Sequence, residues 1–254
     1  MPNHHGAHAS RSGLLASILC AAVLSTGCDR DPRPTIDQNR NPTGALAERI
    51  ELAHGGRRAW ERTSVIEVTF TLTQQDVEKE LTLRLEPATG RYRLTGPGDI
   101  RVMHDGERTH ISNAAAALNP PIPLPDWPML LSTPWTMMDA EGLELAAERT
   151  LNMKPALSLR YHRAGADPSM ALIDPESHEL RAILRLDSAD DDLARGVAIV
   201  FEDSVRFGAL RLATMWRVWS WDDQNGLHGA PLDPVRITNL EFSQPRTGEF
   251  TLPD

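Results

Sequence analysis

The sequence predicts a mainly β protein whose strands form a meandering antiparallel sheet behind an N-terminal helix. From Ile66 to Leu72, apolar and polar residues alternate, which is the period-two pattern of a half-buried strand. The same alternation returns between Leu81 and Leu85. Asp105-Gly106 and Gln224-Asn225-Gly226 mark tight turns between further strands. Sequential strands joined by short turns favour a sheet in which neighbours along the chain pair with each other.

An apolar leader precedes this domain. The run from Leu14 to Ser25 is uncharged and about a dozen residues long, which suits the ~7–15-residue core of a secretory signal. It falls short of the roughly 20 residues that a membrane-spanning helix needs. We therefore expect residues 1–27 to be a signal peptide that is removed during export.

The end of the leader predicts a lipid anchor. Ser25-Thr26-Gly27-Cys28 resembles the bacterial lipobox, in which the cysteine is acylated and becomes the new amino terminus. Cys28 is the expected lipidation site, and it would hold the protein to a membrane of the cell envelope, facing the periplasm. An ordinary secretory signal with a chance cysteine stays open, because Ser25 stands where the lipobox usually has leucine. Asp29 resembles the signal that retains enterobacterial lipoproteins in the inner membrane, so the inner membrane is favoured over the outer one.

Composition and charge limit the partners of the chain. Residues 28–42 are polar and contain three prolines, so we expect a flexible tether of about 14 residues that spans roughly 20 Å before a single domain over residues 43–254. The net charge of −9 argues against nucleic acid, whose phosphates require clustered basic groups. It also gives no attraction to anionic lipid, so membrane attachment depends on the anchor.

Helices are expected at the start and in the middle of the domain. Thr43 is the expected cap of a helix that ends at Gly55-Gly56, and a short turn over residues 57–62 follows. Residues 119–128 contain five prolines and cannot form a central strand, whereas the apolar residues 129–138 are expected to be partly helical. The remaining strands are expected at residues 92–94, 100–104, 107–111, 157–161, 180–186, 197–201, 210–221 and 235–242.

Several short motifs resemble a family of uncharacterised bacterial lipoproteins that is related in fold to the lipoprotein carrier LolA and its receptor LolB. They are His54-Gly55-Gly56 with Trp60, the strand from Ile66 to Leu72, Ile173-Asp174-Pro175-Glu176, and Val200-Phe201-Glu202-Asp203 with Gly208. The resemblance runs loosely from Ala45 to Pro253. It implies an open antiparallel half-barrel of roughly 10–11 strands, with the N-terminal helix and short helices covering the concave face. It also implies an apolar cavity for acyl chains and brings no catalytic residues.

Aromatic and methionine side chains are the candidate ligand contacts. By the period-two rule, Trp219 and Trp221 share one face of their strand with Met215, while Trp216 and Val218 share the other. Flexible methionines and broad aromatic rings suit promiscuous apolar binding. The alternative, which stays open, is that these side chains simply fill the core. The candidate cavity and lid residues are Phe70, Trp127, Leu130, Trp135, Met137, Met138, Trp216 and Trp219.

No pattern indicates an enzyme, a cofactor or a metal. Asp190-Asp191-Asp192 and Asp222-Asp223 lack the alternating spacing of a calcium loop, and no histidine pair has the HExxH spacing of a zinc site. A GxSxG nucleophile elbow is also missing. We therefore expect a monomeric envelope lipoprotein that binds a hydrophobic ligand, such as an acyl chain, a lipid or a lipoprotein tail. The alternative is a structural or interaction lipoprotein whose cavity is filled by its own side chains.

Overall fold

The computed structural model describes residues 41–74, 76–163, 168–187 and 195–252. The predicted signal peptide, Cys28, Asp29 and the predicted tether up to residue 40 lie outside the described residues, as does Asp190-Asp191-Asp192. The described residues belong to one compact unit. None of the helices in these ranges is both long and apolar enough to cross a membrane.

The first helix begins two residues earlier than expected. Asn41, not Thr43, caps it: the Asn41 side chain accepts a hydrogen bond from the Thr43 backbone N–H at 3.1 Å, and Pro42 occupies the first turn. Proline suits that position because the first-turn N–H has no partner within a helix. The helices are α1 (Pro42–Ala53), α2 (Arg57–Glu61), α3 (Asn113–Ala117) and α4 (Trp127–Thr136), with short 3-10 turns η1 (Leu124–Asp126) and η2 (Met137–Asp139) at the two ends of α4.

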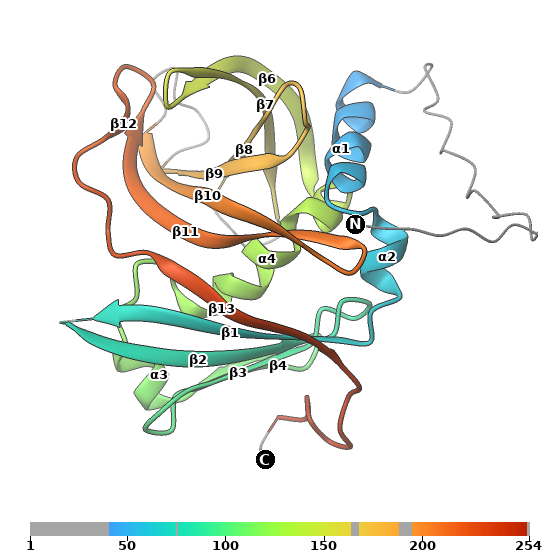
Figure 1. Cartoon of the computed structure of the whole chain (residues 1–254), viewed down its shortest axis with the longest axis vertical. Helices are drawn as coiled ribbons and strands as arrows, with labels where there is room; N and C mark the ends of the chain where they lie inside the picture. The colour runs from blue at the N-terminus through green and yellow to red at the C-terminus, as the bar shows by residue number, and fades with distance from the viewer. Residues whose placement is uncertain (1–40, 75, 164–167, 188–194, 253–254) are drawn as a thin grey trace, which may run out of the picture. The chain divides into compact units, whose positions relative to one another are not determined.

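Thirteen strands form one antiparallel sheet, which confirms the predicted fold class (Figure 1). The strand order is β5-β4-β3-β2-β1-β13-β11-β10-β9-β8-β7-β6, with β12 paired to β11. The end strands β5 and β6 do not pair with each other, so the sheet is open. The strands are β1 (Val65–Gln74), β2 (Val77–Leu85), β3 (Tyr92–Thr95), β4 (Arg101–His104), β5 (Thr109–Ile111), β6 (Glu141–Leu151), β7 (Lys154–His162), β8 (Ser169–Ile173), β9 (Leu180–Leu186), β10 (Arg195–Phe207), β11 (Leu210–Asp222), β12 (Gly226–His228) and β13 (Val235–Ser243).

The expected strand count of 10–11 is too low, because β6, β8 and β12 were not predicted. The edge strand β6 is exposed along nearly all its length, so its sequence shows no apolar alternation. The short strand β8 is buried on both faces from Met170 to Ile173, which likewise removes the alternation. The helix α3 was also missed.

The larger core lies on the face of the sheet that α1, α2 and α4 cover. In β1, Ile66, Val68, Phe70 and Leu72 are buried while the residues between them are only half-buried, as the alternation predicted. Side chains of β2, β3, β9 and β11 join this core, and α4 contributes Trp127, Leu130, Leu131 and Trp135. Figure 1 shows the strands β6–β12 curving through the upper part of the unit and β1–β4 with β13 below them.

A second, smaller core lies on the opposite face of β7–β11. Trp221 belongs to it and Trp219 packs against it, whereas Trp216 and Val218 belong to the larger core. This assignment of faces confirms the period-two prediction for β11. The strand is therefore covered on both faces by the protein's own side chains. The buried members of this second core are Leu151, Ala156, Met170, Leu172, Ala182, Leu184, Leu186, Ala198, Val200 and Trp221.

His54 and Gly55 fix the end of α1 to the sheet. The Leu180 backbone N–H donates to His54 Nε2 at 3.0 Å, so Nδ1 carries the proton and donates to the Arg211 carbonyl at 2.9 Å. Gly55 has a φ of 105°, and a Cβ at this position would lie 2.0 Å from the Ala209 carbonyl oxygen. Only glycine allows this approach. The His54-Gly55-Gly56 motif thus joins α1 to β9 and β11.

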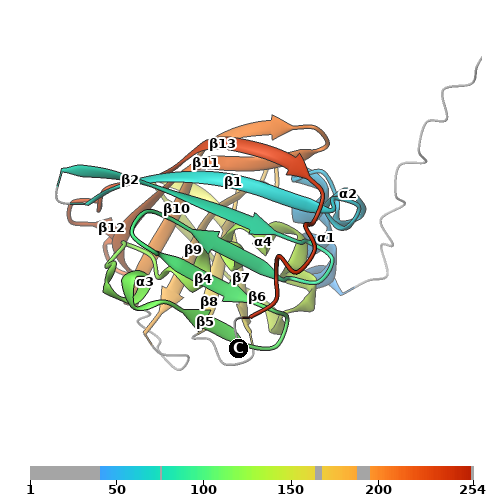
Figure 2. The same cartoon turned by 90° about the horizontal axis from the view of Figure 1, so that it is seen from below.

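The C-terminal tail is held to the outer face of β1 and β2 by buried charges. Arg84 forms ion pairs with Glu249 and Glu67, and it donates to the Gln244 carbonyl at 3.1 Å. Arg84 and Glu249 are both buried. Figure 2 shows the tail after β13 running across this part of the sheet. The tail therefore covers a sheet face that the helices leave open.

Candidate functional site

The helix α4 lies in the larger core and is apolar on most of its circumference. Pro128 occupies its first turn, and Pro134 removes the N–H that would bond to the Leu130 carbonyl. The Thr133 and Thr136 hydroxyls donate to the carbonyls of Met129 and Ser132, which satisfies these hydroxyls within the helix. The buried members of α4 are Trp127, Pro128, Leu130, Leu131, Thr133, Pro134 and Trp135.

Three of the predicted site residues meet in one aromatic cluster beside α4. The Phe70 ring centroid lies 4.7 Å from that of Trp127 and 5.2 Å from that of Trp216. Trp127 and Trp216 are 6.3 Å apart in an edge-to-face arrangement. The cluster joins α4 to β1 and β11 through ring contacts, which depend on apolar burial and quadrupole geometry.

The other predicted site residues are separated. Trp135 is fully buried and stacked on Trp60 at 4.2 Å, away from the cluster. Met137 is fully buried, whereas Met138 is 38% exposed. Trp219 lies on the opposite face of the sheet. Leu130 is buried and faces the Trp216 side of α4, where both line a small cavity.

Polar contacts attach α4 to one side of the sheet. Asp126, just before α4, accepts from Arg185 of β9 at 2.7 Å, and Thr136 accepts from Arg163, which follows β7, at 2.7 Å. Across the described ranges, no hydrogen bond or ion pair joins α4 to β1, β10, β11 or β13. Polar contacts at its two ends therefore attach α4 on the side of β7 and β9, whereas its contacts with the strands on the other side are apolar.

A small apolar cavity lies on the side of α4 that faces β10 and β11. We call the contact between α4 and β10–β11 the seam. The cavity at the seam has a volume of about 20 Å³, which is room for about one water molecule and far too small for an acyl chain. It is lined by His54, Leu130, Leu131, Pro134, Leu180, Phe201, Arg211, Leu212, Ala213 and Trp216.

Eight of the lining residues were not predicted as site residues: His54, Leu131, Pro134, Leu180, Phe201, Arg211, Leu212 and Ala213. His54 and Phe201 belong to the motifs that carry the family resemblance, and these motifs were the sequence feature that could have identified the two residues. Burial lowers the pKa of His54, which keeps the ring neutral and committed to its two backbone partners. Phe201 is only partly buried, with its ring 6.0 Å from that of Trp216, and therefore lies at the outer end of the seam.

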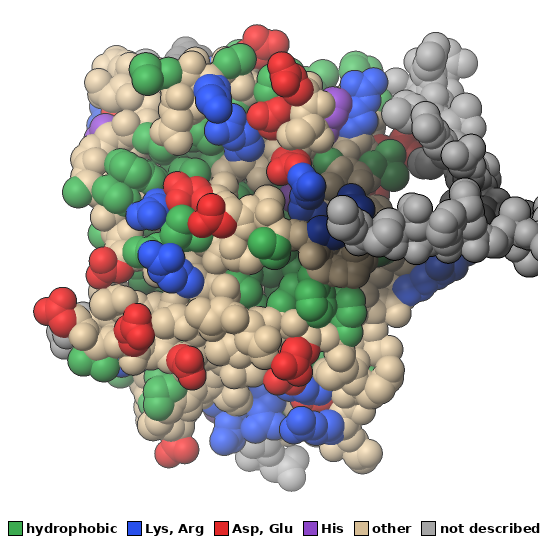
Figure 3. Space-filling view, in the orientation of Figure 1, with side chains coloured by type: hydrophobic (Ala, Val, Ile, Leu, Met, Phe, Trp, Pro, Cys, Tyr) green, Lys and Arg blue, Asp and Glu red, His purple; other side chains and the backbone are tan. Residues whose placement is uncertain are grey.

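Apolar side chains also reach the surface near the ends of β10 and β13. Phe207 and Phe242 contact each other with ring centroids 4.5 Å apart, and Phe242 is 46% exposed. Figure 3 shows hydrophobic side chains gathered where the β10–β11 hairpin meets β13. The strands β11 and β13 pair only at Met215–Arg236 and Trp216–Val235, so they diverge beyond that point.

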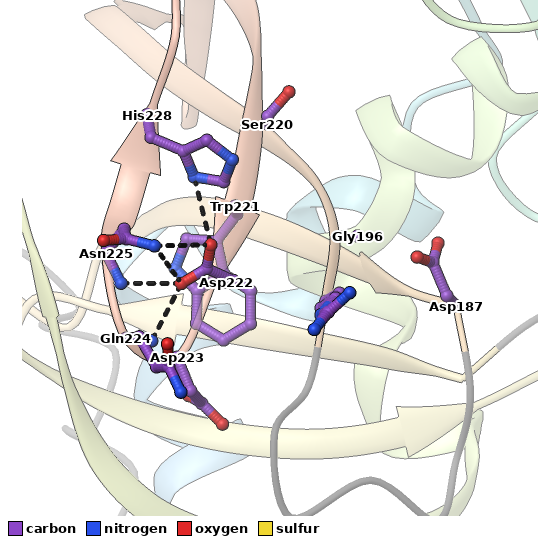
Figure 4. A pocket seen from close by; sticks show the side chains of 10 residues that line it. Asp187, Gly196, Ser220, Trp221, Asp222, Asp223, Gln224, Asn225 and His228 are labelled. Atoms are coloured by element: carbon purple, nitrogen blue, oxygen red, sulfur yellow. Dashed lines mark hydrogen bonds and ion pairs between the residues drawn. The ribbon is translucent and has the colours of Figure 1, made fainter.

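A polar hollow of about 360 Å³ lies beside the turn from β11 to β12 (Figure 4). Asp222 accepts from the Asn225 backbone N–H at 2.6 Å and from its side-chain amide, and these bonds hold the pKa of the Asp222 carboxyl below its usual range. Asp223 pairs with Arg149 at 2.9 Å. Both carboxylates are therefore engaged in fixing the turn. Within the part of the chain that the structure describes, no three His, Cys, Asp or Glu side chains group as metal ligands.

One buried carboxyl lies near α4 without belonging to the seam. Burial raises the pKa of Glu51 to about 7, with Arg57 opposing this and Asp139 adding to it. Arg57 itself donates to both carboxylate oxygens of Asp139 of η2, at 2.9 and 2.8 Å. This group of charges connects α1, α2 and η2.

No family profile matches this sequence, and no curated protein matches it. The fold itself has neighbours among solved structures.

A DUF1329 family protein from Desulfovibrio piger is 10% identical with a TM-score of 0.47, covering 83% of this chain and 98% of its own. A LolA superfamily protein from Nitrosomonas europaea is 9% identical with a TM-score of 0.47, covering 81% and 97%. MucB of Pseudomonas aeruginosa, solved in complex with MucA, is 14% identical with a TM-score of 0.30, and the match covers 62% of that chain.

Proposed function

We propose that this protein is a lipid-anchored envelope protein that binds a hydrophobic ligand, such as an acyl chain, at the seam between α4 and β10–β11. In the described conformation α4 fills that space. Binding therefore requires α4 to move away from β10 and β11 while it stays attached to β7 and β9.

The one-sided attachment of α4 carries this proposal. Apolar contacts are non-directional, so an acyl chain can replace those between α4 and β11 without leaving a hydrogen-bonding group unpaired. The polar contacts that would be costly to break, at Asp126 and Thr136, both lie on the other side. Burying the chain removes apolar area from water at roughly 25 cal/mol per Å², and ordering the chain and moving the helix offset part of that gain.

A structural or interaction protein with a self-filled interior is the second candidate. The cavity volume of about 20 Å³ favours it. The two candidates differ in one respect: only the first binds an added hydrophobic ligand saturably.

The seam is tested by a pair of variants on one strand. We expect the mature chain carrying Cys28→Ser, and hence unacylated, to bind a fluorescent fatty acid saturably. Phe201→Asp places a charge at the outer end of the seam and is expected to weaken binding at least about tenfold, equivalent to about 1.4 kcal/mol. The control Val205→Asp changes a side chain of β10 that is 45% exposed and does not line the cavity, and it should leave the affinity unchanged. Absence of saturable binding, or equal effects of the two variants, would favour the self-filled interior.

The anchor is tested separately from the ligand. Because Cys28 follows small residues at the end of a short apolar core, Cys28→Ser is expected to abolish acylation and release the protein from membranes. Metabolic labelling with a fatty-acid analogue measures this, with Cys20→Ser in the leader as the control that keeps the label. Label retained in the Cys28→Ser protein would contradict the lipobox interpretation.

A further inference from the structure

Two opposite charges lie at the rim of the seam cavity. Arg211, on β11, lines the cavity, and its guanidinium is paired with the Glu179 carboxylate, which immediately precedes β9. Both side chains are partly exposed, at 36% and 23%. A ligand chain in the seam would therefore bring its polar end to a site that already holds one cation and one anion.

No other charged side chain in the described lining of this cavity competes for that polar end. His54 is the second polar lining residue, but both ring nitrogens are bonded to the backbone, at Arg211 and Leu180. Its neutral ring has no free donor or acceptor for a ligand. Arg211 and Glu179 thus decide which headgroup the seam accepts.

We infer that the seam takes a zwitterionic amphiphile, a single-chain lipid whose headgroup carries one anionic phosphate and one cationic ammonium group. This inference rests on the proposed function, because the chain must first enter beside α4. The phosphate oxygens accept from the Arg211 guanidinium and the ammonium group donates to the Glu179 carboxylate. One ion pair is exchanged for two, and each charge keeps a partner.

The other headgroup classes fit the rim less well. A neutral headgroup leaves the Arg211–Glu179 pair intact and gains only the burial of its chain. A carboxylate or another purely anionic headgroup competes with Glu179 for Arg211 and leaves two negative charges side by side. The Arg211–Glu179 pair therefore attracts both charges of a zwitterionic headgroup, whereas the Glu179 carboxylate repels a purely anionic one.

Three ligands with the same twelve-carbon chain test this preference: a lysophosphatidylethanolamine, the fatty acid and the monoacylglycerol, each below its critical micelle concentration. We expect the unacylated Cys28→Ser protein to bind the lysophosphatidylethanolamine about tenfold more tightly than either of the others. Arg211→Met and Glu179→Gln should each reduce that preference to about twofold or less, while binding of the monoacylglycerol stays within about twofold of its original affinity. Because both side chains are partly exposed, neither change buries an unpaired charge in the core.

A matched ion pair on the same strand provides the control. Arg217 of β11 pairs with Glu202 of β10 at 2.8 Å with similar exposure, and neither residue lines the cavity. Arg217→Met should keep the tenfold preference. Equal affinities for the three ligands, or loss of the preference in Arg217→Met, would overturn the headgroup inference and leave the proposed function standing. If none of the three ligands binds, the proposed function fails and the headgroup inference with it.

Discussion

Phe70→Asp is expected to remove at least about 4 kcal/mol from the free energy of unfolding. Phe70 is fully buried and contacts both Trp127 and Trp216. The substitution leaves a void where the ring was and places a carboxylate among apolar rings with no partner. Since a domain of this kind is stable by only about 5–15 kcal/mol, much of the population should be unfolded without denaturant.

Urea denaturation followed by tryptophan fluorescence measures this loss. Thr71→Asp is the control, because its half-buried side chain faces the opposite side of β1, where Arg236 is its neighbour in β13. We expect the control to cost no more than about 1 kcal/mol. A Phe70→Asp protein that unfolds at the parent's midpoint would mean that the register of β1 is wrong.

Arg84→Met should cost about 3–5 kcal/mol, because it leaves the buried Glu249 carboxylate without its cation. Removing both charges in Arg84→Met/Glu249→Leu should recover most of this loss, since an apolar pair replaces an ion pair at little cost. The control is Arg57→Met, which breaks the more exposed pairs with Glu61 and Asp139 and should cost about 1–2 kcal/mol in total. Equal unfolding free energies for Arg84→Met and the parent would show that the tail is not held by these charges.

The ion pair between Arg84 and Glu249 also predicts that the free energy of unfolding depends on pH. Burial raises the pKa of Glu249, but hydrogen bonds from Arg84 and from the Arg246 backbone N–H outweigh this and hold the pKa below its usual range. The folded state therefore binds the proton less readily than the unfolded chain. The contribution of Glu249 to stability is present above the unfolded pKa and is lost as the pH falls through the folded value. Glu249→Gln should correspondingly flatten the acid limb of the stability curve.

Local patterns explain which parts of the fold could be predicted. The strand β1 was predicted because one face is buried and the other is half-exposed, so the period of two is visible in its sequence. The strand β6 lacks this contrast because it is an exposed edge, and β8 lacks it because both faces are buried. Asn41 caps α1 instead of Thr43 because Pro42 is compatible with the first helical turn, so the helix can begin before Thr43.

The site and the attachment of the C-terminal tail depend on long-range contacts that a single sequence does not reveal. Arg84 and Glu249 are 165 positions apart, and His54 reaches Leu180 across 126. The sequence could not separate Trp127 and Trp216, which meet at the seam, from Trp135, which stacks on Trp60. Which side of α4 carries the polar contacts follows only from the packing of β7 and β9 against it.

Quenching by a brominated acyl chain tests most directly whether a ligand enters the seam. Bromine quenches indole emission only at short range, and Trp216 lines the cavity while Trp219 lies on the other face of β11. We expect a dibrominated single-chain lipid to quench the unacylated protein saturably, with Trp216→Phe losing a large part of the quenchable emission and Trp219→Phe losing almost none. Emission that stays unquenched at saturating lipid, or an equal loss from the two variants, would contradict binding at the seam.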